Sequence, residues 1–172
     1  VTEKKYYPSC VLVNRYGNRF SNEKADYDSS WRSFHAKENW GALKYKNIPA
    51  FQIFDHKVRL NGTIAGKTFD QVLPNWFSKS NTIEGLAKKL GINKYNLKST
   101  ISNFNKNALL GIDPDFHRGE THYDRMGLAD TSLALQPLDV PPFYGAEIAP
   151  AHLGTCGGPR VNNFSEVLNV NE

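Results

Sequence analysis

The sequence predicts an α+β fold in which a mostly antiparallel sheet packs against a helical hairpin. Short runs of β-branched and aromatic residues, which are typical of strands, occur at 10–13, 51–54 and 143–148. Two adjacent segments with apolar residues at helical spacing lie between the second and third runs. Strands that surround a helical pair, rather than alternate with helices, are typical of this fold class.

The N-terminal part of the chain is expected to form the first strands. The strand at 10–13 is followed by turn residues at 16–18 and by a second arm at 19–20, which predicts a hairpin. The next strand is expected within residues 48–59. A loop punctuated by glycines follows it, at 60–69.

The middle of the chain carries the helical hairpin. The clearest helical pattern lies at 81–92, where Asn81 or Thr82 can cap the start and Gly91 can end the helix. A second helix is expected within 93–111. Its apolar face consists of Leu97, Ile101, Phe104 and Ala108.

The last third of the chain is expected to be mostly irregular. Residues 113–130 are polar and predict a long surface loop, in which Asp113, Asp115 and Arg118 form hydrogen bonds and ion pairs with one another. A final strand is expected at 164–170, after the proline-rich approach to the strand at 143–148.

Composition limits the classes of function. The 172 residues fit one domain, and 40% hydrophobic with 22% charged residues is ordinary for a globular protein. The net charge of +4 is spread along the chain, which predicts a solvated basic face and no nucleic-acid partner. No apolar run approaches the roughly 20 residues of a membrane span. Two cysteines, Cys10 and Cys156, without a signal peptide predict free thiols and a cytoplasmic location.

Two local patterns offer other functions. The helical pair around Gly91 resembles a helix-turn-helix, but Thr100 stands where that motif needs an apolar residue. A helical hairpin packed on a sheet is the preferred interpretation, and a DNA-binding or other non-enzymatic interaction module is kept as an alternative. His117 and His122 lie near several carboxylates, but no second cluster completes a metal site, so none is expected.

Four segments, taken in order, resemble one family. They are "VLVNRYGNRFSNEKADYD", "IPAFQIFD", "LGIDPDFHRGETHYDR" and "PPFYGAEIAPAHLGTCGGPRVN". Together they resemble the fumarate reductase/3-ketosteroid dehydrogenase flavoproteins, and the last two resemble the 3-ketosteroid 1-dehydrogenase branch.

The resemblance implies the capping domain of a two-domain flavoprotein. It implies that residues 1–148 form the substrate-binding cap and that 149–172 return into an FAD-binding domain of the same polypeptide. The GxGxxG dinucleotide fingerprint does not occur in the sequence. We therefore expect an excised or truncated cap that retains no FAD and has no activity by itself. We also expect it to self-associate through the interface left exposed.

The resemblance assigns the chemistry to Tyr27. Fumarate reductases carry an Arg–Asp pair at this position, whereas Tyr27-Asp28 matches the steroid type. This implies α,β-desaturation of a ketone or steroid-like substrate, with Tyr27 accepting a proton while hydride leaves to FAD. A fumarate-reductase-like enoate reductase is the alternative, with Arg32 as a misregistered substitute.

The other expected site residues follow from the same resemblance. Arg19 and Glu23 are expected to position the turn that faces the flavin through charge-assisted hydrogen bonds. Thr155, Gly157 and Gly158 are expected near the flavin edge. The substrate is expected to contact Phe116, Tyr144 and His152. His152 and Cys156 depart from the steroid pattern, so other ketones or enoates stay open as substrates.

Overall fold

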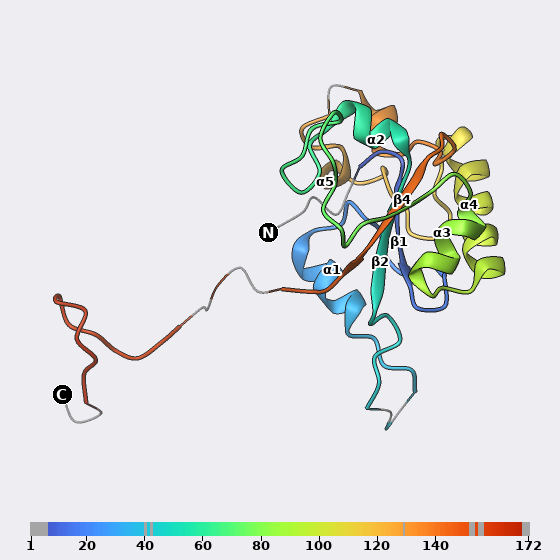
Figure 1. Ribbon diagram of the computed structural model, residues 1–172. Helices are drawn as coiled ribbons and strands as arrows, with labels where there is room; N and C mark the ends of the chain where they lie inside the picture. The colour runs from blue at the N-terminus through green and yellow to red at the C-terminus, as the bar shows by residue number, and fades with distance from the viewer. Residues whose placement is uncertain are drawn as a thin grey trace.

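The computed structural model describes residues 7–39, 41, 43–128, 130–151, 154 and 157–169. Its centre is a four-stranded antiparallel sheet with helices on both faces, and the chain beyond the last strand extends away from this body (Figure 1). The strands are β1 (Cys10–Asn14), β2 (Ala50–Phe54), β3 (Ser78–Ser80) and β4 (Phe143–Ile148). Their order in the sheet is β1-β2-β4-β3. The predicted α+β class with an antiparallel sheet is therefore confirmed.

The helices are α1 (Tyr27–Phe34), α2 (His56–Asn61), α3 (Ile83–Leu90), α4 (Lys94–Leu109) and α5 (His122–Arg125), with a 3-10 turn at Thr131–Ala134. The predicted hairpin of α3 and α4 is confirmed. Thr82 caps α3 by accepting from the Gly85 amide at 3.0 Å, and Gly91 ends it with a φ of 70°. No helix within the described ranges is long and apolar enough to cross a membrane.

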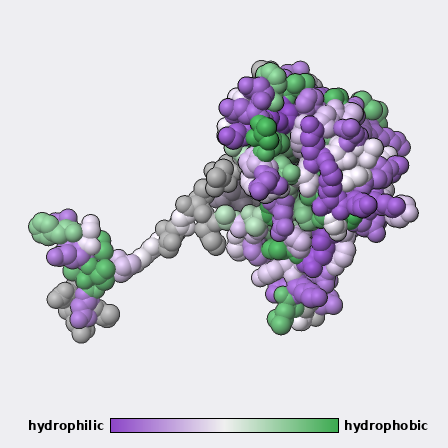
Figure 2. Space-filling view, in the orientation of Figure 1, coloured by the Kyte–Doolittle hydropathy of each residue, from purple (hydrophilic) through white to green (hydrophobic). Residues whose placement is uncertain are grey.

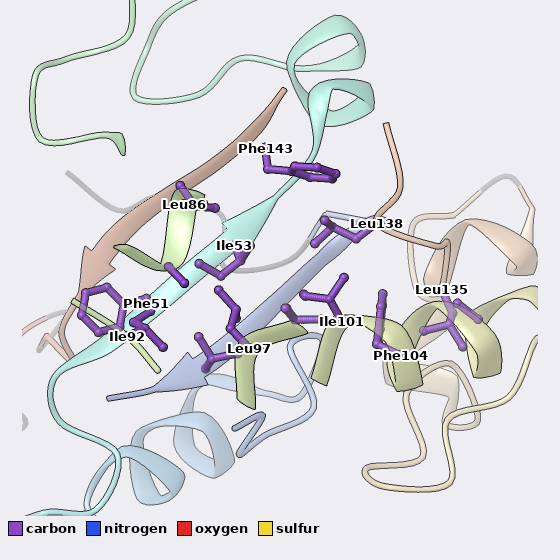
Figure 3. Packing of buried hydrophobic residues seen from close by; sticks show 14 residues of the cluster. Phe51, Ile53, Leu86, Ile92, Leu97, Ile101, Phe104, Leu135, Leu138 and Phe143 are labelled. Carbon is purple, nitrogen blue, oxygen red and sulfur yellow. The ribbon is translucent and has the colours of Figure 1, made fainter. Parts of the chain in front are cut away.

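The larger core lies between the sheet and the helical hairpin. Side chains alternate across a strand, so every second residue of β1 and β2 faces α3 and α4. The buried cluster on this side includes Val11, Val13, Phe51, Ile53, Leu86, Leu97, Ile101, Phe104 and Phe143 (Figure 3). The apolar face predicted for α4 thus packs against the sheet, as expected for a helical hairpin on a sheet. The two helices are not arranged as a helix-turn-helix that reads DNA.

Two smaller clusters cover the opposite face of the sheet. In the first, Phe54 and Tyr144 pack with Val58 of α2. In the second, Phe34 of α1 packs with Leu12 and Ala50, and Ile148 at the end of β4 lies against them. This second cluster matters for the site, because it brings α1 to the place where the chain leaves the sheet.

Three predicted elements differ from the structure in form or extent. The expected hairpin arm at 19–20 is a single bridge between Val13 and Arg19 on the outer edge of β1, where the Leu12 amide donates to the Glu23 carboxylate rather than to a paired strand. The strand expected within 48–59 is confirmed as β2, but it stops at Phe54, since the Asp55 carboxylate accepts from the Lys57 amide at 3.1 Å and starts α2. Of the strand expected at 164–170, the described part makes one bridge, between Val161 and Val167.

Candidate functional site

A buried network of four charged side chains lies behind the turn that leads into α1. The Arg19 guanidinium makes paired contacts of 2.7–2.8 Å with the carboxylates of both Glu23 and Asp113. Arg118 Nη1 donates to Glu23 Oε2 at 3.0 Å. Glu23 also accepts from the Leu12 amide at 3.0 Å. Two cations and two carboxylates balance, which lets them remain charged inside the protein.

The network holds its carboxylates in the ionised form. Burial by itself would raise the pKa of Glu23, but the charge and hydrogen bonds of Arg19 outweigh it and hold that pKa below its usual value. The pKa of Asp113 is also held below its usual value, because the hydrogen bonds and charge of Arg19 outweigh the effect of burial. The pKa of Arg19 is raised, because the two carboxylates more than offset its own desolvation.

Arg118 anchors the polar segment at 113–130, which is otherwise mostly exposed, as predicted for a surface loop. Its side chain is fully buried and donates to four backbone carbonyls as well as to Glu23. The carbonyl partners belong to Tyr7, Pro8, Cys10 and Ala134, at distances of 2.6–3.2 Å. The expectation that Asp113, Asp115 and Arg118 bond within their own loop was wrong for the ion pairs, since Asp113 and Arg118 pair with Arg19 and Glu23.

The turn from Glu23 to α1 is fixed at each step. Asn22 donates to Asp124 Oδ2 at 3.0 Å, and its own carbonyl groups accept from the amides of the next residues. Asp26 caps α1 by accepting from the amides of Asp28 and Ser29. Tyr27 is the first residue of the helix and is 73% exposed. The predicted catalytic phenol therefore reaches solvent from a rigidly held turn.

The glycine-rich segment begins close to α1. Ile148 ends β4 in the cluster that holds Phe34, so the chain departs from the same face of the sheet that carries Tyr27. Gly157 and Gly158 are exposed, and an added Cβ would meet no atom within 4 Å at either position. Their backbone is open to a flat ligand. His152 and Thr155 lie outside the described residues.

Phe116 lies on the other face of the sheet. The Arg19 guanidinium stands 5.0 Å from the ring centroids of both Phe116 and Phe104, and Phe104 belongs to the core beneath α4. Phe116 and Arg19 line an open polar cleft of about 440 Å³, together with Asn18, Asn96, Ser99, Thr100, Asn103 and Asp115. The structure thus separates Phe116 from Tyr27.

Tyr144 is buried in the sheet rather than presented to solvent. Its ring stacks on Phe54 at 5.4 Å, and its hydroxyl lies 3.2 Å from His56 Nδ1. It is 5% exposed. The substrate contacts predicted for Phe116 and Tyr144 therefore do not converge in the described residues, and Tyr144 contributes packing beneath α2.

Other candidate groups were also located. Arg32 lies on α1 in an exposed ion pair with Asp28, five residues from Tyr27 and so on a different side of the helix. It does not stand in for a residue at the Tyr27 position. Sequence reasoning missed the contacting aromatic rings of Trp31 on α1, His35 at its end and Tyr45 in the loop that follows. The signal was the spacing of four residues between Tyr27, Trp31 and His35. Among the described residues, no three His, Cys, Asp or Glu gather as metal ligands would.

Comparison with known proteins identifies the family. A family model described as an FAD binding domain matches residues 1–172. The chain belongs to this FAD-binding domain family. FAD is the family's cofactor, and the predicted cofactor is confirmed at that level. The matched description does not distinguish a capping role within such proteins, so that assignment stays a prediction.

The relatives are oxidoreductases. The 4-oxocyclohexanecarboxylate 2-dehydrogenase of Sinomonas cyclohexanicum is 34% identical over 95% of this chain and 29% of its own length. The 3-oxosteroid 1-dehydrogenase of Mycobacterium tuberculosis is 35% identical over 90% of this chain and 29% of its own length. The NADH:fumarate oxidoreductase of Klebsiella pneumoniae is 26% identical over 94% of this chain. The chain thus spans less than a third of the dehydrogenases it matches.

Solved structures share the fold. The 3-ketosteroid delta1-dehydrogenase from Sterolibacterium denitrificans, in complex with 1,4-androstadiene-3,17-dione, has a TM-score of 0.75 at 28% identity. The match covers 95% of this chain and 31% of that one. A fumarate reductase flavoprotein subunit from Lactobacillus plantarum, solved by NMR in solution, has a TM-score of 0.55 at 19% identity and is covered to 88%. A chain of similar extent with this fold therefore exists in solution.

Proposed function

We propose that this chain is the substrate-covering part of an FAD-dependent dehydrogenase that introduces a double bond beside the carbonyl of a cyclic ketone. One observation carries the proposal. The helix that begins at Tyr27 and the end of β4 pack in one cluster, through Phe34 and Ile148. The helix that carries the exposed Tyr27 phenol and the strand that leads into the glycine segment therefore meet on the same face of the sheet.

The type of sheet supports a covering role over a nucleotide-binding one. Dinucleotide-binding units use parallel strands and a glycine-rich turn that opens a helix. The described sheet is wholly antiparallel, and the GxGxxG pattern does not occur in the sequence. The described residues thus fit an edge contact with FAD at Gly157 and Gly158, and not a complete site for the cofactor.

The segment after β4 supports a division of the chain into a cap at 1–148 and a return segment at 149–172. Val161, Phe164 and Val167 are 52–85% exposed and lie outside the clusters of the core. Figure 2 shows hydrophobic surface on the part of the chain that extends from the body. Apolar side chains gathered in this way are expected to be covered by another part of the flavoprotein.

The chemistry separates into a proton and a hydride. Desaturation removes a proton from the carbon beside the carbonyl and a hydride from its neighbour, and leaves a carbon–carbon double bond. FAD, when bound, supplies the hydride acceptor. Tyr27 in its phenolate form accepts the proton and becomes the neutral phenol, and the buried Glu23 and the Asp26 cap hold the turn from which it projects.

The substrate class follows from the relatives together with the residue at position 27. Two dehydrogenases whose names specify an oxocyclohexane or an oxosteroid are 34% and 35% identical to the chain. What these names share is a ketone within a ring. A fumarate-type reaction is disfavoured, because α1 starts with Tyr27 and Arg32 lies on another side of the helix.

A segment exchange tests the proposal. This chain would replace the matched segment of the Sinomonas dehydrogenase, and flavin content and turnover of 4-oxocyclohexanecarboxylate would be measured. We expect a yellow protein that desaturates the ketone, and a Tyr27→Phe variant that keeps its flavin but loses at least a hundredfold in kcat. Tyr95→Phe, at an equally exposed tyrosine on α4, is the control and should change neither.

Two results would overturn the proposal. Stoichiometric retention of FAD by the 172-residue chain alone would contradict the covering role. A flavin-loaded exchange protein that is inactive toward the ketone, or that is unaffected by Tyr27→Phe, would contradict the assigned chemistry.

A further inference from the structure

A row of aromatic rings in contact with one another begins on α1, four residues after Tyr27. Trp31 lies four residues after Tyr27 and therefore on the same side of the helix. The rings of Trp31 and His35 are 4.0 Å apart at an interplanar angle of 32°. His35 meets Tyr45 edge-on at 5.1 Å. The rings thus support one another from α1 into the loop that follows it.

This row of rings is held in place by polar contacts, and its Trp31 ring stays accessible. His35 Nδ1 lies 2.8 Å from the Trp31 carbonyl oxygen, which fixes the histidine ring against the helix end. The Lys37 ammonium stands 4.9 Å from the centroid of the Tyr45 ring. Trp31 is nevertheless 39% exposed, because the residues of α1 that face the sheet are Ser30 and Phe34. Part of the Trp31 indole is thus open to solvent on the side of α1 that carries Tyr27.

We propose that Trp31, supported by His35, is the residue that sets substrate size, by providing a flat wall for the rings beyond the reacting one. The inference rests on the proposed function of Tyr27. A helix rises about 1.5 Å per residue, so Trp31 lies about 6 Å and His35 about 12 Å along the axis from Tyr27. A single-ring ketone held at Tyr27 reaches only the near edge of Trp31. A fused-ring ketone extends over Trp31 and toward His35.

This geometry predicts an effect that depends on the substrate. Aromatic and alicyclic rings gain by covering an indole face, and that gain is lost when the ring is truncated. Trp31→Ala should therefore weaken binding of a fused-ring ketone and leave a single-ring ketone almost unaffected. If this row of rings instead packed against another part of the flavoprotein, truncation would change flavin content and both substrates alike.

The test uses two segment exchanges with this chain, one in the Sinomonas dehydrogenase and one in the Mycobacterium tuberculosis 3-oxosteroid dehydrogenase. The probes are 4-oxocyclohexanecarboxylate and 4-androstene-3,17-dione, respectively. KM and kcat are measured by turnover, and Kd by the change in flavin absorbance on adding the ketone. Variants are Trp31→Ala and Trp31→Phe, with Trp76→Ala as the control. Trp76 is 49% exposed but stacks on Phe77 beneath the other end of the sheet.

We expect Trp31→Ala to raise KM and Kd for the steroid at least fivefold, with kcat within twofold, and Trp31→Phe to restore most of the loss. For the single-ring ketone both constants should change less than twofold. Equal effects on the two substrates, or none on the steroid, would overturn the inference while Tyr27→Phe still abolished turnover. Loss of dehydrogenation in the unsubstituted exchange proteins would instead contradict the proposed function.

Discussion

Replacing Arg118 by alanine should destabilise the protein more than any other single truncation of a charged side chain in the network. The side chain has no exposed surface and bonds to Glu23 and to four backbone carbonyls. Removing one partner of a buried ion pair costs about 3–5 kcal/mol. Each carbonyl left without a donor adds about 1–3 kcal/mol unless water enters the space.

The expected loss for Arg118→Ala is therefore at least about 4 kcal/mol, a large part of the roughly 5–15 kcal/mol that stabilises an ordinary domain. Arg118→Lys keeps the positive charge but has only three donors on one atom, so it cannot serve all five acceptors. We expect about half the loss for it. The lysine variant keeps the experiment informative if the alanine variant does not fold.

Urea unfolding of the 172-residue chain, followed by far-ultraviolet circular dichroism, measures both losses. Arg32→Ala is the matched control, because its ion pair with Asp28 is 60–75% exposed and contributes no more than about 0.5 kcal/mol. A loss below about 1.5 kcal/mol for Arg118→Ala, with an unchanged m-value, would refute the reasoning. It would mean that water replaces the guanidinium at little cost.

Three further predictions follow from the same structure. The pKa of Glu23 is lowered in the folded state, so its ionised carboxylate stabilises the protein above the normal carboxyl range, and this stabilisation is lost as pH falls below about 4.5. Glu23→Gln should therefore be less stable than the wild type at pH 7, and its free energy of unfolding should fall less steeply in acid. Burial raises the pKa of Cys10 to about 12, so in a Cys156→Ser background a thiol reagent at pH 8 should label the chain only after unfolding. Gly145→Ala would bring a Cβ within 2.6 Å of a methyl group of Leu90, the last residue of α3, and should lower the free energy of unfolding by about 1–3 kcal/mol. Gly154→Ala is the control: its Cβ meets no neighbour, so the loss measured by the same urea unfolding should be less than about 0.5 kcal/mol.

Local patterns predicted the parts of the fold that local forces decide. The apolar face of α4 and the caps of α3 depend on residues within one or two turns, and both were found as expected. The strand at Phe143–Ile148 was likewise visible as a run of large residues after prolines. The polar strand β3 (Ser78–Ser80) was missed, since it forms only because β4 offers an edge to pair with. Helix α2 was missed because Asp55, its N-cap, directly follows an apolar run, a pattern that predicts it to be part of the strand.

The site was harder to predict, because its bonds join distant residues. Arg19 pairs with Asp113 and Glu23 with Arg118 across more than ninety positions, which no spacing rule connects. A resemblance to known flavoproteins selected Arg19 and Glu23, but it gave no reason to bury them. Tyr27 was selected in the same way, and its placement at an exposed helix start depends on the Asp26 cap, which is a local signal.

The buried charges explain why the turn before Tyr27 does not need an apolar core of its own. Hydrophobic contacts fix how close two segments lie but leave their direction adjustable, whereas paired guanidinium–carboxylate contacts also fix orientation. Glu23 receives bonds from β1, from its own turn and from the 113–130 segment, so three parts of the chain converge on one carboxylate. Apolar residues of similar volume could match the stability of such a network. We infer that the charged network instead fixes the angle at which α1 starts, and with it the positions of Tyr27 and Trp31 on that helix.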